Sequence, residues 1–252
     1  SVTYGAGGST RTRTHATVKR LVTETDLHPA AHLTCIGATR AEVDEVIRGY
    51  WDAGMRHIVA LRGDPPDGVG ARYVPHPDGY ANAAELTAGI RRIADFEVSV
   101  GSYPEKHPES ASLEADLDLL RQKVDAGATR AITQFAFDAE VIVRFRDRVA
   151  AAGLDVPIIP GVMPINNFAG ICRFAERCGA SIPAWLRALF RGLDDDASTR
   201  QMVAAAVASE HCRQLRSEGF DQFHFYTLNK ADLTHAACVM LGVRPRDEEA
   251  RS

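Results

Sequence analysis

The stretch "HIVALRGDPP" (57–66) starts as an apolar run and ends on Arg-Gly-Asp followed by two prolines. Apolar residues at consecutive positions are typical of a parallel strand that is covered on both faces. Glycine lets the backbone turn sharply, and proline cannot continue a strand ladder. The stretch therefore predicts a buried strand that stops at a polar turn.

The same pattern recurs along the whole chain. Apolar runs predict strands at 1–5, 32–37, 57–63, 98–104, 131–135, 157–164 and 223–228. Helical stretches separate them at about 14–25, 40–53, 81–94, 110–126, 138–152, 167–178 and 231–241. The region 183–218 predicts a short and a long helix, the long one starting near "DDDAST", where we expect the aspartates to cap it.

Seven strand–helix repeats without a break in composition predict one α/β domain over residues 1–252. We expect a (β/α)8 TIM barrel from which the first strand and its helix are absent. The alternative is a doubly wound open sheet. Such a sheet usually carries G-x-G-x-x-G after a strand, and "GAGGST" after the first strand does not match it.

Composition narrows the functional classes. The 252 residues are 45% hydrophobic and 25% charged, with a net charge of -4 and no basic stripe, so we expect neither nucleic acid nor membrane as a partner. No apolar run approaches the ~18 residues of a membrane span. Five cysteines without a C-x-x-C pair favour reduced thiols in the cytoplasm. The histidines lack ligand spacing such as H-E-x-x-H, so we expect no metal site.

Polar residues gather where the expected strands end, notably Thr3, Arg62, Asp64, Tyr103 and Gln134. TIM barrels build their active sites at this end of the strands. Arg62 and Asp64 could instead be a solvated loop pair, and Tyr103 could merely close a strand. No Ser-His-Asp order and no P-loop is present, so residue chemistry alone predicts only a barrel enzyme with a polar, aromatic-edged pocket. Such a pocket suits an enzyme in which the protein positions a cofactor that reacts.

Eight motifs then show a resemblance, and they run in order from Ser1 to about Pro245. The chain resembles bacterial methylenetetrahydrofolate reductase through "SVTYGAGGS", "HLTCIGAT", "RHIVALRGDPP", "YPEKHPE", "KVDAGATRAITQFAFD", "PIIPGVMPINNF", "IPAW" and "FHFYTLNK". The resemblance implies a (β/α)8 barrel that holds FAD without a covalent bond. It also implies ping-pong reduction of 5,10-methylenetetrahydrofolate to 5-methyltetrahydrofolate by NADH or NADPH, in one-carbon metabolism and methionine biosynthesis.

The resemblance also implies site residues. Asp64 matches an aspartate beside the flavin ring and the folate, and is the expected catalytic residue. Gln134, Phe174 and Lys230 match substrate-contacting positions, although Lys230 stands where arginine is common. The positions that match the surroundings of FAD are Thr3, His32, Arg62, Gly63, Asp64, Tyr80, Ala81, Gly101, Tyr103, His107, Asp116, Lys123 and Ile132.

The chain departs from the family pattern at three places. Leu119 replaces a usual polar FAD contact, and Gly170 replaces a glutamine that touches substrate. The family's first strand and its catalytic glutamate have no counterpart, so we expect about fifty further residues before Ser1, scaled from a βα unit of ~30 residues plus a leader. Two other functions stay open: a flavin barrel like proline dehydrogenase, and an inactive barrel that binds FAD or folate. We also expect a homo-oligomer.

Overall fold

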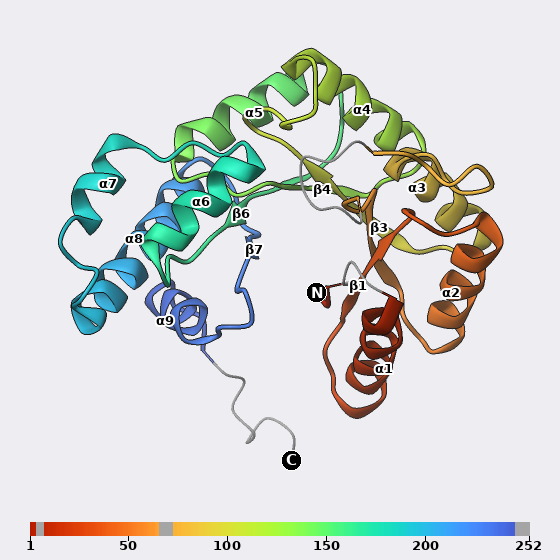
Figure 1. The fold of residues 1–252 in the computed structure, drawn as a ribbon, viewed down its shortest axis with the longest axis horizontal. Coiled ribbons are helices and arrows are strands. Elements are labelled where there is room, and N and C mark those ends of the chain that lie inside the picture. Colours follow the sequence, from red (N-terminus) through yellow and green to blue (C-terminus); the bar gives the residue numbers. More distant parts are fainter. Residues whose placement is uncertain (4–7, 66–72, 245–252) are drawn as a thin grey trace. The chain divides into compact units, whose positions relative to one another are not determined.

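The computed structural model describes residues 1–3, 8–65 and 73–244. Strands and helices alternate along this part of the chain (Figure 1). The strands are β1 (Ala30–Thr34), β2 (His57–Leu61), β3 (Glu97–Ser102), β4 (Arg130–Thr133), β5 (Ile158–Ile159), β6 (Gly161–Val162) and β7 (His224–Phe225). The helices are α1 (Gly8–Glu24), α2 (Arg40–Asp52), α3 (Ala83–Ile93), α4 (Leu113–Asp125), α5 (Ala139–Ala151), α6 (Phe168–Cys178), α7 (Ala184–Phe190), α8 (Ala197–Ser217) and α9 (Asp232–Met240).

The strands form two sheets. The larger has the order β1-β2-β3-β4-β5, and the smaller joins β6 to β7. β1 pairs with β2 and β2 with β3 in parallel, and β6 pairs with β7 in parallel. Parallel strands joined by helices confirm the α/β class and agree with a partial (β/α)8 barrel.

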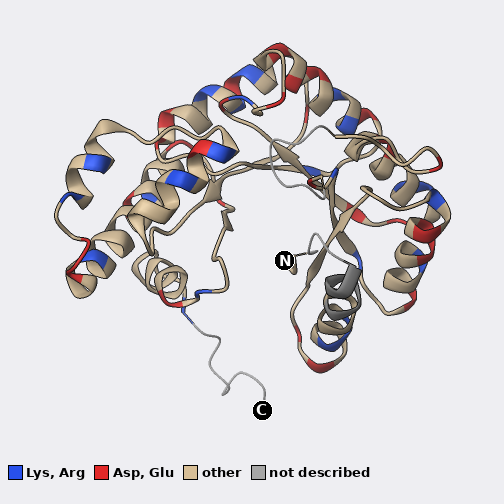
Figure 2. Cartoon of the chain, viewed as in Figure 1, with Lys and Arg blue, Asp and Glu red and all other residues tan. Residues whose placement is uncertain are grey.

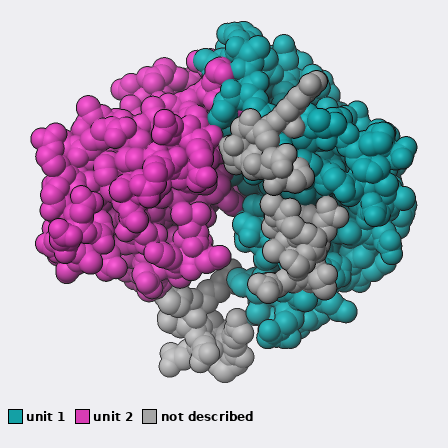
Figure 3. Space-filling model, in the orientation of Figure 1, with its two compact units in different colours: residues 1–103, 108–132, 149–158 teal, residues 104–107, 133–148, 159–252 magenta. Residues whose placement is uncertain are grey.

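The chain divides into two compact units (Figure 3). Unit 1 comprises residues 1–103, 108–132 and 149–158, and unit 2 comprises 104–107, 133–148 and 159–252. The expectation of one catalytic domain stays a prediction.

Most expected elements are present, but several differ in extent, and the strand expected at 223–228 covers only His224–Phe225. The strand expected at 1–5 is a single bridge between Val2 and Ala31, while residues 4–7 lie outside the described part. The strand expected at 157–164 is interrupted at Pro160, which has no N–H to donate to a ladder. The helix expected from residue 14 already starts at Gly8.

Side chains at the helix starts fix where several helices begin. Thr39 and Glu42 form a capping box at α2, and Asn82 and Ser112 cap α3 and α4. The carboxylate of Asp196 accepts a hydrogen bond from the N–H of Thr199 at the start of α8, which confirms the expected aspartate cap. Within unit 1, α2, α3 and α4 carry charged residues of both signs (Figure 2).

In unit 2, Thr133 joins three strands that are distant in sequence. Its side-chain oxygen accepts a hydrogen bond from the N–H of Gly161 (2.9 Å), and its carbonyl oxygen accepts one from the hydroxyl of Tyr226 (2.9 Å). A Cβ at position 161 would lie 2.3 Å from the Thr133 carbonyl oxygen, so only glycine allows this approach.

None of the helices in the described part of the chain has the length and apolar character of a membrane span.

Candidate active site

The two faces of strands β1 to β3 differ sharply. The strand register places Ala31, Ile58 and Val98 side by side, and all three are completely buried. The neighbouring row of the opposite face holds His32, Val59 and Ser99. Because side chains alternate along a strand, the second face also carries Thr34, Leu61 and Gly101. We call these the apolar face and the polar face of unit 1.

Three residues that match FAD positions lie on this alternation. His32 and Gly101 belong to the polar face by register. Ile132 is partly buried and lies between the fully buried Ala131 and Thr133 of β4. Because side chains alternate along a strand, these three expected ligand residues lie next to buried residues that point to the opposite side.

Arg62 follows β2 and is held by several groups of unit 1. Its Nη1 and Nη2 donate to the two carboxylate oxygens of Glu109, at 2.6 and 3.2 Å. Its Nε donates to the carbonyl oxygen of Gly63 at 3.3 Å. The ring of Tyr73 lies 4.6 Å from the guanidinium carbon. The guanidinium is therefore fixed at the carboxyl end of β2.

Gly63 has a positive φ of 89°, which side chains other than glycine rarely adopt. A Cβ there would also lie 2.5 Å from Cγ2 of Ile36. The turn thus requires glycine for two reasons: its positive φ, and the close approach of Ile36, which leaves no room for a Cβ. The next residue, Asp64, is exposed, so its carboxylate is accessible at this strand end.

Lys123 on α4 is a buried cation near the same strand ends. Its side chain is only 7% exposed, and Nζ donates to the carbonyl oxygen of Gly101 at 2.8 Å. Burial lowers the pKa of Lys123 to about 8, although the negative charge of Asp116 opposes this effect. Asp116 also accepts a hydrogen bond from the hydroxyl of Ser110. The register pairs Ala60 with Val100, so Arg62 after β2 and the buried Lys123 ammonium at Gly101 of β3 lie at neighbouring strand ends of unit 1. Two positive charges at neighbouring strand ends suit an anionic ligand.

Tyr80 is placed differently. Its ring is completely buried, and its hydroxyl donates to Asp44 of α2 at 2.6 Å and accepts from Arg92 of α3 at 3.1 Å. The Tyr80 side chain therefore serves helix packing, and only its backbone remains for a ligand. The N–H of Ala81 donates to the carboxylate of Glu85 at 3.2 Å.

The other expected residues of unit 1 lie near the chain start and after β3. The carbonyl oxygen of Thr3 accepts a hydrogen bond from Thr14, and Nε2 of His32 lies 3.1 Å from the hydroxyl of Ser1. Tyr103 is partly buried just after β3. His107 is also partly buried and belongs to unit 2.

The three expected substrate residues all belong to unit 2. The amide oxygen of Gln134 accepts from the N–H of Phe135 at 3.1 Å, which leaves its NH₂ group for a ligand. Phe174 stacks on Phe135, with 5.6 Å between the ring centroids. Lys230 is exposed and follows two residues with positive φ, Leu228 (49°) and Asn229 (60°).

Two of the three departures from the family pattern, Leu119 and Gly170, lie on helices. Leu119 is partly buried on α4. The N–H of Gly170 donates to the Asn167 side chain that caps α6. Neither side chain supplies a polar group.

Sequence reasoning missed Glu109 and Tyr73, two residues whose side chains contact the Arg62 guanidinium. Glu109 is the last residue of "YPEKHPE", and its place in that motif was a usable signal. Nothing in the sequence connects Tyr73 with Arg62.

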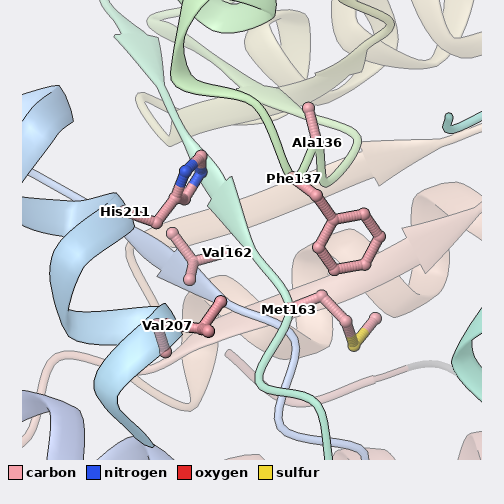
Figure 4. A pocket seen from close by; sticks show the side chains of 7 residues that line it. Ala136, Phe137, Val162, Met163, Val207 and His211 are labelled. Carbon is pink, nitrogen blue, oxygen red and sulfur yellow. The ribbon is translucent and has the colours of Figure 1, made fainter. Parts of the chain in front are cut away.

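Two further polar features lie elsewhere in the units. At the amino ends of the unit 1 strands, Nε2 of His57 lies 2.7 Å from the hydroxyl of Ser99, and Arg130 pairs with Glu97 at 2.8 Å. In unit 2 a small apolar pocket is lined by Phe137, Val162, Met163 and Val207 together with His211 (Figure 4). His211 is 8% exposed and burial lowers its pKa to about 4, so it is neutral at pH 7. No group of three His, Cys, Asp or Glu residues among the described ones could hold a metal ion.

Comparisons with known proteins place this site in a family. Residues 1–242 match the family described as methylenetetrahydrofolate reductase. A 5,10-methylenetetrahydrofolate reductase from Salmonella typhimurium is 51% identical over 245 residues, which are 97% of this chain and 80% of that protein. A probable methylenetetrahydrofolate reductase (NADH) from Oryza sativa subsp. japonica is 33% identical over 262 residues, covering 100% of this chain and 44% of that protein.

One solved structure shows a weaker likeness. It is an uncharacterized protein from Clostridium thermocellum that binds two copies of 5-methyl-5,6,7,8-tetrahydrofolic acid, with a TM-score of 0.44, 15% identity and coverage of 90% of this chain and 100% of that chain. This likeness is too slight to support a conclusion. The family match and the 51% identity each extend over almost the whole chain. They confirm the resemblance read from the eight motifs: the chain belongs to the methylenetetrahydrofolate reductase family.

Proposed function

We propose that this methylenetetrahydrofolate reductase works with non-covalently bound FAD and takes its reducing equivalents from NADH or NADPH. The observation that carries the proposal is the cationic site of unit 1, where Arg62 and Lys123 lie beside a glycine turn and an accessible carboxylate. The name of the Oryza sativa relative includes NADH, which supports NADH as the donor.

The residues at the carboxyl ends of the unit 1 strands fit FAD. Two cations suit its pyrophosphate, because guanidinium and ammonium groups bind phosphate oxygens strongly. Glycines at positions 63 and 101 present backbone without a side chain at two strand ends. Bound FAD would accept hydride from the nicotinamide and pass it to the folate. We propose that His32, Gly101, Tyr103, Asp116 and Ile132 complete its surroundings, with Thr3, Tyr80, Ala81 and His107.

Asp64 is the proposed catalytic residue. Its carboxylate would stabilise the cationic 5-iminium form of the folate by charge and would disfavour extra negative charge on the neighbouring cofactor. In unit 2, the free NH₂ group of Gln134 would bind the folate and Phe174 would stack on a planar ring. Lys230 would contact the substrate from the turn after β7. The nicotinamide would leave before the folate enters, which gives ping-pong kinetics.

We also propose a cytoplasmic homo-oligomer. The five cysteines lie within the described part of the chain and all are free thiols, which supports a reducing compartment.

The visible spectrum of the purified protein tests the proposal. We expect a yellow protein that NADH bleaches and methylenetetrahydrofolate restores, and FAD in the supernatant after denaturation. A flavin that ignores folate would favour a proline dehydrogenase-like enzyme, and a flavin that never bleaches would favour an inactive binding protein. A folded sample that takes up no FAD would refute the proposal.

Asp64→Asn sharpens this test. We expect the flavin reduction potential to rise and folate reduction to slow about tenfold or more, with a smaller effect on NADH oxidation. The two half-reactions are measured separately by stopped-flow absorbance. Asp155→Asn, at an exposed position elsewhere in unit 1, serves as the control. Equal slowing of both half-reactions at an unchanged potential would make Asp64 a structural residue only.

A further inference from the structure

The guanidinium of Arg62 already has an anionic partner in this chain. Glu109 accepts hydrogen bonds from both terminal nitrogens of Arg62, at 2.6 and 3.2 Å. Carboxylates and phosphates bind a guanidinium through this same paired geometry. Glu109 thus occupies the edge of Arg62 that a phosphate group would use.

Arg62 has further contacts besides Glu109 that hold it in place. Its Nε is bound to the Gly63 carbonyl oxygen, and its guanidinium lies over the ring of Tyr73. Its own carbonyl oxygen accepts hydrogen bonds from the N–H of Ile36 (3.1 Å) and from the thiol of Cys35 (3.4 Å). These contacts hold the backbone and the inner edge of the side chain, so Glu109 contributes charge rather than placement.

The ion pair is also easy to exchange. The side chains of Arg62 and Glu109 are 26% and 32% exposed, so water reaches both. Ion pairs in contact with water are weak. The buried Lys123 ammonium at Gly101 lies at the next strand end, so its positive charge also attracts a ligand with two negative charges and helps it to compete for Arg62.

We propose that Glu109 is an internal substitute for the phosphate of the cofactor. It neutralises Arg62 in the free chain and yields the guanidinium when the pyrophosphate of FAD binds. This inference rests on the proposed function, because it assumes an anionic cofactor at Arg62. Glu109 then lowers the affinity for FAD while it stabilises the empty site.

Glu109→Gln tests the inference by titration of the cofactor-free protein with FAD. We expect affinity about tenfold higher than that of the wild type, because a like charge near the phosphates is removed. We also expect a lower melting temperature without cofactor. Adenosine diphosphate, which has the pyrophosphate and no flavin, should show the same gain. Glu109→Ala gives a second variant, with the same expected direction.

Glu105→Gln is the matched control. Glu105 comes from the same "YPEKHPE" segment, but its carboxylate accepts a hydrogen bond from the N–H of Ser181 (2.9 Å). Its FAD affinity should equal that of the wild type. Unchanged or weaker FAD binding by both Glu109 variants would overturn the inference and make Glu109 a positioning residue at most. If the wild type itself binds no FAD, the proposed function fails instead.

Discussion

The apolar face and the polar face of unit 1 come from the same three strands and differ in their residue types, although both contain buried residues such as Ile58 and Val59. Ala31, Ile58 and Val98 on the apolar face are completely buried, and their aliphatic side chains carry no polar or reactive group. The polar face carries His57 and Ser99 at one end and Gly101 at the other. One strand thus supplies both stability and a candidate site, because successive side chains point to opposite sides.

The difference predicts how substitutions divide. Changes on the apolar face should reduce the free energy of unfolding and leave FAD affinity intact. Changes at the carboxyl end of the polar face should alter cofactor binding, with stability affected little or even improved. Two substitutions within the strands test this division, and two at residues that pack beside them extend the test.

Ile58→Ala should have the largest effect. Removing a completely buried side chain leaves a cavity, and we expect the free energy of unfolding to fall by about 4 kcal/mol. Chemical denaturation measures the change, and FAD titration of the folded protein should give an unchanged dissociation constant. Leu61→Ala, on the other face of the same strand and only partly buried, should cost clearly less. Equal losses would erase the distinction between the faces.

His57→Gln tests the amino end of the polar face. Burial is the main cause that lowers the pKa of His57 to about 4, and the positive charge of Arg130 adds to it. The unfolded chain therefore binds the extra proton first, so stability is complete above pH 6.5 and is lost as the pH falls towards 4. The loss from this one group is up to about 3 kcal/mol.

Glutamine cannot take up that proton, but its side-chain amide can still form a hydrogen bond with Ser99. Unfolding measured between pH 7 and 4 should show a shallower decline than in the wild type. His235→Gln, at an exposed position of α9, should follow the wild-type curve. A curve for His57→Gln that also follows the wild type would show that another group controls acid stability.

Lys123→Met should separate stability from function. Burial lowers the pKa of the Lys123 ammonium to about 8, so keeping it charged at pH 7 costs free energy. We expect methionine to raise the free energy of unfolding by about 2 kcal/mol at pH 7, even though the Gly101 carbonyl loses its donor.

The wild type gains stability as the pH rises from 8 to 10.5, so the advantage of Lys123→Met should shrink over that range. FAD affinity should fall at the same time. Lys19→Met on the exposed side of α1 is the control. A variant that is less stable and still binds FAD normally would contradict this account.

Tyr80→Phe should have the smallest effect. The lost hydroxyl bonds to Asp44 and Arg92, so we expect a cost of about 1 kcal/mol in unfolding and no change in FAD content. A double-mutant cycle with Asp44→Asn measures the coupling. If Tyr80→Phe lost FAD and showed no energetic coupling with Asp44→Asn, the Tyr80 side chain would instead contact the cofactor.

The sequence predicted much of this fold because apolar runs and helix caps are local signals. The run at 57–63 became β2, and the aspartates before α8 cap it as expected. The break at Pro160 and the bond between Arg62 and Glu109 were missed. The break occurs because Pro160 has no N–H to donate to the hydrogen-bond ladder, and the sequence pattern does not show where the ladder needs that donor. The ion pair joins residues that are 47 positions apart in the sequence. The resemblance also did not place the Tyr80 side chain, because a match to a family position does not say which atoms face the ligand.

The contacts of Thr133 in unit 2 also determine when that unit can finish folding. Thr133 and Tyr226 are 93 residues apart, and helices α6, α7 and α8 lie between β6 and β7 in the chain. Pairings across such separations form slowly, because a long loop must close before the contact is gained. During synthesis, the Thr133 segment leaves the ribosome long before Tyr226 does. Unit 2 therefore passes through a period in which its first strands exist without their last partner, and an unpaired strand edge of this kind favours aggregation.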